Sequence, residues 1–458
     1  MVDDLLRRGC DVTVVTTPPY YPQWKIAEGF RKWGWWSDAT EPRLKVRKDE
    51  LGDHGERRLI RGRLKVIRCP LWVPDQVSGL KRIIHLASFG LSSVPAVIWS
   101  AIRLRPDVVM TVEPAAFCMP TTWLAARLCG AKAWLHVQDF EVDAAFELGI
   151  LKQPILKTLV LAVEAFLMRR FDRVSTISTS MIDRLATKGV DTNRTYLFPN
   201  WVDCEAMRPL ENPHVFREQF QLPIDKCIAL YAGNIGAKQG LELVVEAARR
   251  AVGSPDIRFV ICGHGAAFPS IEAAIRSGQM ITEPMALATG DALNNTNTDG
   301  TKHAASACGS GDRRVAPAAS ADGSGKASLS NLTLLPVQPF EIFNQLMNCA
   351  DIHLLPQRAD AADLVMPSKL TGMLATGRPV VACASPGTQV AQVVAGRGCV
   401  VPPGDAVAFT ESVMKLAADP AERERLGKAA REYALDHLGK AVILDLFFRE
   451  LQSVASVR

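Results

Sequence analysis

The sequence predicts an α/β protein built from two Rossmann-like, doubly wound domains that face a cleft. The chain has 458 residues, which is too long for one ordinary domain. Short runs rich in β-branched residues alternate with longer helical periods, and this alternation occurs in two successive series. We therefore expect a first domain over residues 1–205, a second over residues 206–436, and a C-terminal helix over residues 437–458 that packs back on the first domain.

The first series contains four short apolar runs that we expect to form strands of a parallel sheet. They are separated by longer helical periods, as in a chain of β-α units. The expected strands are Asp11–Thr16, Asp107–Thr111, Lys132–Val137 and Arg173–Ser178, and the expected helices include Thr121–Leu128 and Ile155–Arg170.

The second series is more regular and ends in a helical tail. Asp419 and Pro420 predict a helix start, because Asp is a good N-cap and Pro is favoured at the first helical position. A stretch from about residue 285 to 330 has few large apolar residues, so we expect a disordered surface insertion there. The expected strands are Cys227–Tyr231, Ile257–Cys262, Leu332–Leu335, Asp351–Leu355, Pro379–Cys383 and Cys399–Val401; the expected helices include Leu241–Arg250, Glu341–Asn348, Ala406–Ala417 and the tail Val442–Leu451.

The segment from Ile83 to Ile102 has no Asp, Glu, Lys or Arg. Its length could span a bilayer. However, it contains His85, four serines and Pro95, and basic residues flank both of its ends. We favour an ordinary buried helix, then a helix lying in a membrane interface, and a spanning helix last.

Charge and cysteine usage restrict the class of protein. The net charge is +5, with the basic excess in the first 200 residues, which suggests that the first domain faces an anionic partner. No nucleic-acid-binding motif accompanies this charge, so we expect a membrane surface or a phosphorylated lipid and no nucleic acid. The eleven cysteines include no C-x-x-C pair, and the N-terminus has no signal peptide, so we expect a cytoplasmic protein without disulfides.

Two glycine-rich motifs follow expected strands of the second domain. Residues 231–240 read YAGNIGAKQG, in which glycines let the backbone approach a phosphate at the start of a helix. The G-K-[ST] ending of a Walker loop is missing, and a purely structural strand-to-helix turn remains an equal alternative. Residues 262–265 read CGHG, but Phe268 replaces the third glycine of a dinucleotide fingerprint, so a hydride-transfer enzyme is not favoured.

The most informative stretch runs from His353 to Ala382. An expected buried strand ends at Leu355, a polar loop follows, and Pro367-Ser-Lys369 opens a helix. Backbone amides, a hydroxyl and an ammonium at one helix N-terminus suit a diphosphate. A capped helix with a solvated lysine is an equal alternative.

With these motifs in hand, the chain resembles the retaining nucleotide-sugar glycosyltransferases of family 4, which have the GT-B fold. It is most similar to the group assigned to colanic acid and related exopolysaccharide biosynthesis. The matching pieces cover most of the chain apart from the insertion: residues 18–24, 136–143, 198–203, 233–240 and 353–382.

The resemblance implies a role for each matching residue. Catalysis is assigned to His136, near the donor sugar, and to Lys238 and Lys369, near the diphosphate. Acceptor contacts are assigned to loops of the first domain that contain Tyr20, Tyr21 and Trp24. The residues implied to bind the nucleotide sugar are Gly233, Asn234, Gly236, Gly263, Gly265, Val337 and Ser368.

The resemblance also implies the substrates. The donor is a GDP- or UDP-linked sugar, with GDP-fucose as the first candidate, and the acceptor is a lipid-linked oligosaccharide at the inner face of the plasma membrane. No cofactor is implied, and the sequence leaves the oligomeric state open. Retention implies front-face displacement, in which the departing diphosphate helps to deprotonate the acceptor hydroxyl.

An acidic run could in principle bind a metal. Asp139, Glu141 and Asp143 are spaced two residues apart, and carboxylates are ligands of Mg²⁺ and Mn²⁺. Octahedral sites usually draw on separate elements, however, so we expect no metal.

Three departures from the family pattern matter for activity. The chain starts inside a helix that ends at Asp4–Arg8, so we expect the first strand and its glycine-rich loop to be missing. Leu364 and Gly372 stand where many relatives have two glutamates, and Asp360 or Asp363 would have to replace their contacts. The usual Arg and Lys of the first loop of the second domain correspond to Asn234 and Gln239.

Two alternative functions therefore remain open: a sugar-nucleotide 2-epimerase of the same fold, and an inactive homologue that binds nucleotide or membrane.

Overall fold

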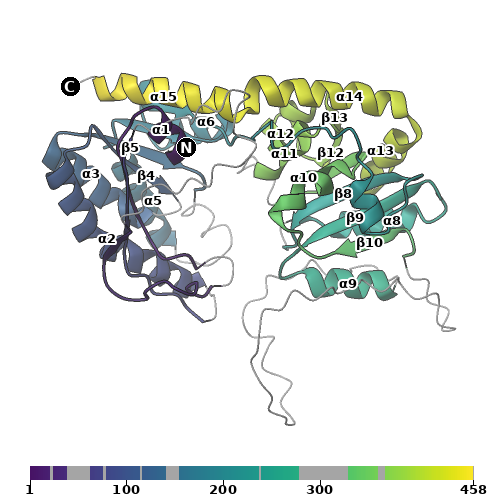
Figure 1. Ribbon diagram of the computed structural model, residues 1–458, viewed down its shortest axis with the longest axis horizontal. Helices are drawn as coiled ribbons and strands as arrows, with labels where there is room; N and C mark the ends of the chain where they lie inside the picture. The colour runs from purple at the N-terminus through teal and green to yellow at the C-terminus, as the bar shows by residue number, and fades with distance from the viewer. Residues whose placement is uncertain are drawn as a thin grey trace, which may run out of the picture. The chain divides into compact units, whose positions relative to one another are not determined.

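A computed structural model describes residues 1–20, 24–38, 62–75, 79–113, 116–140, 154–236, 239–277, 329–358 and 367–456 (Figure 1). The chain divides into two compact units. Unit 1 contains residues 1–203 together with residues 436–458, and unit 2 contains residues 204–363 and 367–435.

Unit 1 is an α/β unit with two separate sheets. The order β1-β3-β2 forms one sheet, in which β1 and β3 are parallel, and β4-β5-β6-β7 forms a second, wholly parallel sheet. The sequence predicted one doubly wound sheet, but within the described residues β1 and β4 are not paired with each other. The elements are α1 (Val2–Arg7), β1 (Val12–Thr16), β2 (Trp36–Asp38), β3 (Leu64–Arg68), α2 (Gly79–Leu104), β4 (Val108–Glu113), η2 (Ala116–Cys118), α3 (Met119–Cys129), β5 (Lys132–Val137), α5 (Pro154–Met168), β6 (Arg173–Thr176), α6 (Thr179–Thr187), η3 (Thr192–Arg194), β7 (Thr195–Leu197) and α15 (Lys440–Ser456).

Strand β5 carries the core of unit 1 on both of its faces, because successive side chains of a strand point to opposite sides. Leu135 packs in the cluster that contains residues of α3, α5 and α6. Trp134 points the other way, toward α15, and its ring lies 5.3 Å from that of Phe447. Phe447 also stacks on Phe198 at 4.4 Å, which fixes α15 to unit 1.

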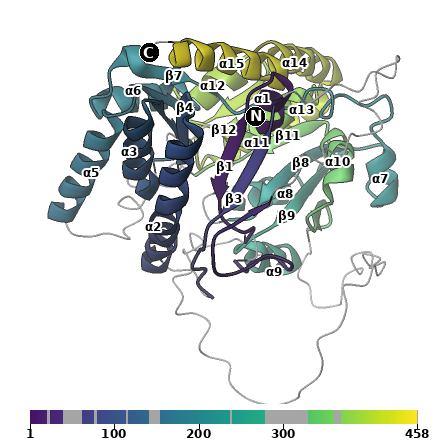
Figure 2. The ribbon, with the colours of Figure 1, turned by 60° about the vertical axis from the view of Figure 1, so that its left-hand side comes forward.

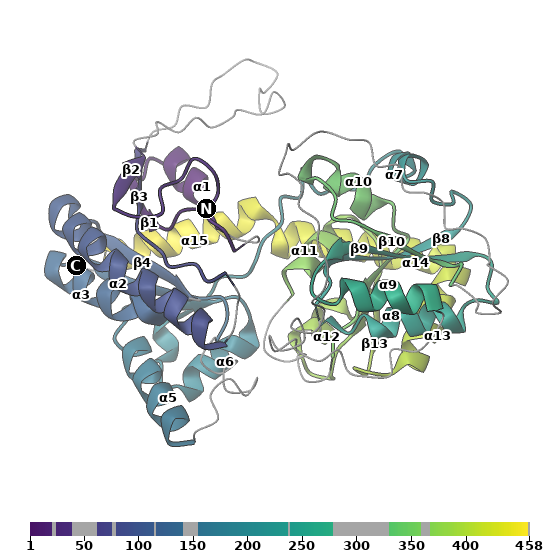
Figure 3. The same cartoon turned by 90° about the horizontal axis from the view of Figure 1, so that it is seen from below.

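Unit 2 has a single six-stranded parallel sheet in the order β10-β9-β8-β11-β12-β13. Helices α8, α9 and α13 cover one face of this sheet, and α10 lies on the other (Figure 3). The elements are α7 (Val215–Gln219), β8 (Cys227–Asn234), α8 (Glu242–Arg250), β9 (Ile257–His264), α9 (Phe268–Ser277), β10 (Leu332–Leu335), η5 (Phe340–Ile342), α10 (Phe343–Asn348), β11 (Ile352–Leu355), α11 (Ser368–Ala375), β12 (Val380–Cys383), α12 (Gln389–Val394), β13 (Gly398–Val401), α13 (Ala406–Ala418) and α14 (Pro420–Tyr433), with η7 (Ala434–Leu438) at the junction with unit 1.

Every expected strand is present, with ends that shift by no more than three residues. The predicted cap is also confirmed, because the Asp419 carboxylate accepts a hydrogen bond of 2.9 Å from the Glu422 amide. Most of the expected insertion lies outside the described residues, but the side chain of Leu329 at its end is buried. All ten cysteines among the described residues are free thiols.

Helix α2 corrects one expectation. The preferred interpretation of this segment, an ordinary buried helix, is wrong, because only 28% of its most apolar window is buried. Leu91 is 75% exposed and Trp99 is 51% exposed. By length and composition alone α2 could cross a membrane. Sequence periodicity identified the helix but could not tell what covers it.

Candidate functional site

The candidate site of unit 2 lies where the strand order reverses. Successive strands β8, β9 and β10 extend the sheet in one direction, whereas β11, β12 and β13 extend it in the other. In doubly wound folds the usual ligand position is the crevice at the carboxyl edge of the sheet where the strand order reverses, which in this sheet is the edge between β8 and β11. Gly240 packs against the loop after β11, since a Cβ there would lie 3.2 Å from the carbonyl carbon of Gln357.

Glycines let the backbone segments at this edge approach each other closely. Gly233 pairs with Gly263 across β8 and β9, and a Cβ on Gly263 would overlap the carbonyl oxygen of Gly233. A Cβ on Gly265 would likewise overlap the carbonyl oxygen of Ile235. Gly233 has φ +150°, a conformation that side chains rarely adopt. These residues are required for the shape of the loop, whichever ligand it binds.

We predict that Gly263→Ala destabilises unit 2 by about 2 kcal/mol or more, because β8 and β9 must separate to admit the methyl group. Gly372→Ala in α11 is the matched control. Among the described residues, no atom outside the nearby backbone of α11 lies within 4 Å of a Cβ at that position, and alanine favours a helix, so the control should be neutral or slightly stabilising. Denaturant unfolding of both variants checks this prediction. Equal stabilities would contradict it.

The N-terminus of α11 presents backbone amides to the same edge. Pro367 is the N-cap and accepts the Leu370 amide through its carbonyl, and no side chain of the described residues caps the helix. The Ser368 side chain is exposed. An uncapped helix start with a neighbouring hydroxyl can bind the oxygens of an anion.

Lys369 brings a cation to this edge from the first turn of α11. Its Nζ donates hydrogen bonds to Gln239 Oε1 at 2.8 Å and to the Tyr231 hydroxyl at 3.2 Å. The ammonium also lies 4.4 Å from the centroid of the Tyr231 ring, a cation–π contact. The Tyr231 hydroxyl in turn donates to the backbone oxygen of Asn234 at 2.6 Å. The lysine head is therefore held against the β8 loop.

Burial lowers the pKa of Lys369 to about 8, because the charged ammonium is poorly solvated there. A bound diphosphate would favour the charged form and raise this pKa again. Lysine is an effective phosphate ligand as a point charge. The group is therefore suited to neutralise an anion that arrives at, or develops in, the crevice.

This pKa predicts the pH dependence of nucleoside diphosphate binding. The free protein loses the Lys369 proton as the pH rises through about 8, so affinity should be greatest below that pH and fall above it. Isothermal titration calorimetry with UDP and GDP between about pH 6.5 and 9.5 measures the effect. A Lys369→Met variant should show weak binding without this inflection. An unchanged inflection in the variant would assign the titration to another group.

Most of the residues expected to bind the nucleotide sugar come together at this edge. Gly263 and Gly265 contact the β8 loop, and Ser368 precedes Lys369 in α11. Val337 follows β10 at the same end of the sheet and is exposed. Lys238 lies outside the described residues. The members of the cluster are Gly233, Asn234, Gly236, Gly263, Gly265, Ser368 and Lys369.

Three further residues of the site carry no role in the sequence prediction. Gln239 and Tyr231 hold the Lys369 ammonium. Gln357, directly after β11, has a buried Oε1 with no hydrogen-bond partner within the part of the chain that the structure describes. Such an acceptor is costly unless it binds a donor, for example a ligand hydroxyl. One indication in the sequence that Gln239 belongs to the site is that it stands at a position where relatives usually have a lysine.

The buried environment of His136 determines its protonation state. It lies in β5 of unit 1 and is only 3% exposed. The Gln138 amide donates to its Nε2 at 2.7 Å, so Nδ1 carries the proton and donates to Ser175 Oγ at 2.9 Å. Burial lowers the pKa of His136 to about 4, so the ring is neutral at pH 7. A charged imidazolium near the donor sugar is therefore not favoured, and a hydrogen bond to the sugar requires one of these contacts to break.

The expected acceptor residues are partly described. Tyr20 and Trp24 lie together in unit 1, with ring centroids 5.7 Å apart, and both pack on His85. His85 is buried, and its Nδ1 lies 2.6 Å from the Trp72 carbonyl oxygen. Tyr21 lies outside the described residues.

Several residues that the sequence weighed as ligands also lie outside the described residues. They include Glu141 and Asp143 of the acidic run and the positions 360, 363 and 364 of the loop after β11. Asp139 is described. Within the described ranges, no group of three His, Cys, Asp or Glu side chains could hold a metal ion.

Comparison with known proteins identifies the chain. Residues 1–201 match the family described as "Glycosyl transferase 4-like domain". The chain is also 34% identical over 461 residues to WcaI of Escherichia coli (strain K12), whose name describes a glycosyl transferase of colanic acid biosynthesis. It is a family 4 glycosyltransferase of the WcaI group. The match covers 99% of this chain and 94% of the relative, so the family relationship extends through both units.

Solved structures confirm the fold. Sucrose-phosphate synthase from Thermosynechococcus elongatus has a TM-score of 0.59 and 18% identity, with coverage of 85% of this chain and 84% of that one. Anabaena HepE in complex with UDP has a TM-score of 0.56 and 13% identity, with coverage of 89% of both chains. The glycosyltransferase thus has the GT-B fold that the sequence predicted.

Proposed function

We propose that this glycosyltransferase transfers a sugar from a nucleoside diphosphate sugar to a lipid-linked oligosaccharide in the synthesis of an exopolysaccharide related to colanic acid. The observation that carries the donor proposal is the Lys369 ammonium, held at the uncapped start of α11 beside the glycine-rich β8 loop. Similarity to WcaI supports the pathway, and the UDP complex of the structurally similar HepE supports the class of donor.

In the proposed reaction, the bond between the anomeric carbon and the diphosphate oxygen breaks as the acceptor hydroxyl approaches from the same face. The departing diphosphate accepts the hydroxyl proton, and the new glycosidic bond keeps the anomeric configuration of the donor. The protein stabilises charge on the leaving oxygens through Lys369 and the first amides of α11, and no further cofactor takes part. The proposed role of His136, which is neutral at pH 7, is to form a hydrogen bond with the donor sugar.

The proposal includes a location. The acceptor is membrane-bound, so we place the enzyme in the cytoplasm and peripherally on the inner face of the plasma membrane. The aromatic pair Tyr20 and Trp24, together with Tyr21, is proposed to face the acceptor.

A substrate screen tests the proposed function. Purified enzyme is incubated with GDP- and UDP-sugars, starting with GDP-fucose, with and without lipid-linked oligosaccharide acceptors. We expect nucleoside diphosphate release only when an acceptor is present, and a product linkage of the same anomeric configuration as the donor by NMR. Formation of an epimerised nucleotide sugar without acceptor would identify a 2-epimerase. Thermal stabilisation by UDP or GDP without turnover of any donor would identify an inactive homologue.

A further inference from the structure

Helices α2, α3 and α5 of unit 1 lie side by side (Figure 2). Each of them exposes apolar side chains. In α2 the exposed large apolar side chains are Leu80, Ile84, Leu91, Trp99, Ile102 and, at the C-terminal end, Leu104. All of them except Leu104 are spaced so that they lie on one side of the helix. A 26-residue helix with so continuous an exposed apolar face is unusual on a soluble protein surface.

The two neighbouring helices continue this apolar surface. Leu124 and Leu128 are exposed four residues apart in α3. Leu159, Val163 and Phe166 are exposed at spacings of four and three residues in α5. The outward-facing residues of the three helices are hereafter called the helical face.

The charges on the helical face have one sign. Helices α2 and α3 contain no acidic residue, and the single acidic residue of α5, Glu164, is buried in an ion pair with Lys188. Exposed arginines lie at the ends of the apolar stripes: Arg103 at the end of α2, Arg127 in α3, and Arg169 directly after α5. The three helices are therefore apolar along their exposed sides, and the exposed charges within them are basic. One exposed acid, Asp107, lies beyond the end of α2.

Aromatic residues on the helical face lie next to cations. Lys65 Nζ is 4.5 Å from the Trp99 ring centroid, and the Arg170 guanidinium is 4.4 Å from that of Phe166. The indole of Trp35 also donates to the backbone oxygen of Ser92 in α2 at 2.7 Å. Tryptophan and basic side chains beside apolar stripes are characteristic of segments that lie in a membrane interface.

From these observations we infer that the helical face docks unit 1 on an anionic lipid bilayer, with α2 lying in the interface rather than crossing the membrane. The apolar stripes enter the boundary between headgroups and acyl chains, and the arginines contact lipid phosphates. A second copy of the chain fits less well, because self-association would place arginines against arginines. This inference deepens the proposed function by naming the surface that brings the enzyme to its membrane-bound acceptor.

Vesicle flotation of the full-length protein tests this inference. Wild-type protein should bind vesicles of phosphatidylglycerol and phosphatidylcholine more tightly than vesicles of phosphatidylcholine alone. Binding to the anionic vesicles should weaken when NaCl is raised from about 0.05 M to about 0.5 M, because salt screens the arginine–phosphate attraction.

Two variants remove apolar contacts without changing charge: Leu91→Gln/Trp99→Gln/Ile102→Gln in α2, and Val163→Gln/Phe166→Gln in α5. Each should reduce the partition coefficient at least tenfold. A matched control, Val252→Gln/Val407→Gln, changes two exposed valines of unit 2 and should stay within twofold of wild type. Because every substituted side chain is already exposed in the wild-type protein, thermal unfolding of all three variants should match that of wild type.

Wild-type binding by both α2 and α5 variants would overturn the inference. So would a wild-type dimer that binds no vesicles and becomes monomeric in these variants, since the helical face would then be a protein interface. Thermal stabilisation of unit 2 by UDP or GDP is measured in parallel. Absence of vesicle binding by the wild-type enzyme, with nucleotide binding and turnover intact, would refute only the docking surface, whereas vesicle binding by the wild-type enzyme without nucleotide binding would refute only the proposed function.

Discussion

A Lys369→Met variant is expected to lose about 100- to 1,000-fold in kcat, the usual cost of removing one group that stabilises charge in the transition state. The Lys369 ammonium is the cation held beside the glycine-rich β8 loop by Gln239 and Tyr231. Charge on the leaving diphosphate increases as the glycosidic bond breaks, so the loss should fall mainly on kcat rather than on KM for the donor.

The thermal stability of Lys369→Met should not fall with its activity. Burial disfavours the ammonium, as the lowered pKa shows, so an uncharged side chain of similar length should leave the fold as stable as before or more stable. Thermal unfolding together with kcat separates a catalytic role from a structural one. Lys428→Met, in the exposed part of α14, is the control and should keep wild-type activity. A Lys369→Met enzyme with kcat within threefold of wild type would contradict the proposed role.

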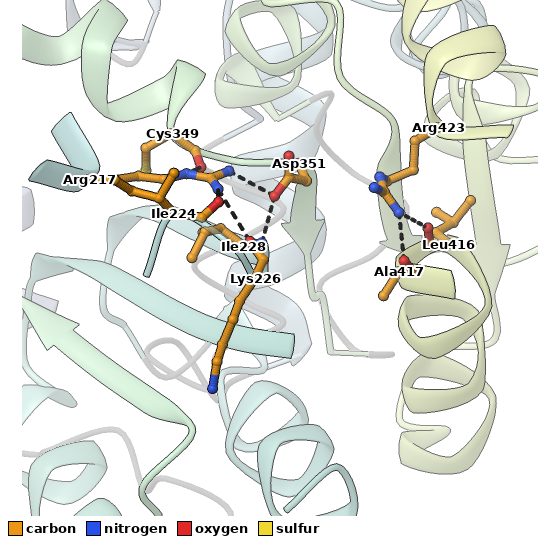
Figure 4. Close-up of polar contacts among 9 residues, drawn as sticks. All are labelled: Arg217, Ile224, Lys226, Ile228, Cys349, Asp351, Leu416, Ala417 and Arg423. Atoms are coloured by element: carbon orange, nitrogen blue, oxygen red, sulfur yellow. Dashed lines mark hydrogen bonds and ion pairs between the residues drawn. The ribbon is translucent and has the colours of Figure 1, made fainter. Parts of the chain in front are cut away.

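The second large effect concerns the end of the sheet opposite the site. Arg217 of α7 is only 2% exposed. Its guanidinium donates to the carbonyl oxygen of Cys349 at 2.9 Å and forms an ion pair with Asp351 at 2.7 Å (Figure 4). The same carboxylate oxygen accepts the Ile228 amide at 2.7 Å. Two more carbonyl oxygens, of Ile224 and Lys226, accept from Nη1 at 3.3 and 3.2 Å. One side chain thus joins α7 to the beginnings of β8 and β11, the two strands on either side of the crevice.

Arg217→Met should lower the free energy of unfolding of unit 2 by about 3–5 kcal/mol, because it leaves the half-buried Asp351 carboxylate and several carbonyl oxygens without their partner. Arg217→Lys should lose nearly as much unfolding free energy as Arg217→Met, since an ammonium cannot reproduce the fork of guanidinium donors. Urea denaturation followed by circular dichroism measures the loss.

Arg276→Met is the matched control. Arg276 forms an ion pair of similar length, 2.7 Å, with Glu272, but its side chain is 77% exposed. Exposed pairs contribute about 0–1 kcal/mol. Equal losses in the Arg217 and Arg276 variants would show that burial of the Arg217 network is unimportant.

Parallel strands were the most predictable part of the fold. Strands β5 and β10 begin and end at the predicted residues. Strand β5 is buried over almost its whole length, and such a strand appears in the sequence as a short, mainly apolar run. Helix α2 shows the opposite case. Its periodicity predicts a helix, but whether Leu91 meets a core or solvent depends on elements distant in sequence.

The same distinction applies to the site. The glycines around Gly233 and the helix start at Ser368 could be predicted, since each depends on local geometry. The contact between Lys369 and Gln239 joins residues 130 positions apart, so no local pattern reveals it. The neutral state of His136 likewise depends on burial and on a bond to Ser175, 39 residues away.

Hydrogen–deuterium exchange of the full chain with and without UDP or GDP is the most direct test of the central claim that the β8 loop and the first turn of α11 bind a diphosphate. We expect slower exchange in peptides that contain residues 233–240 and 367–371 when a binding nucleotide is present, because the phosphate oxygens accept hydrogen bonds from those amides. The effect should disappear in Lys369→Met at the same nucleotide concentration and persist in Lys428→Met. Protection confined to other segments at saturating nucleotide would contradict the assignment of the site.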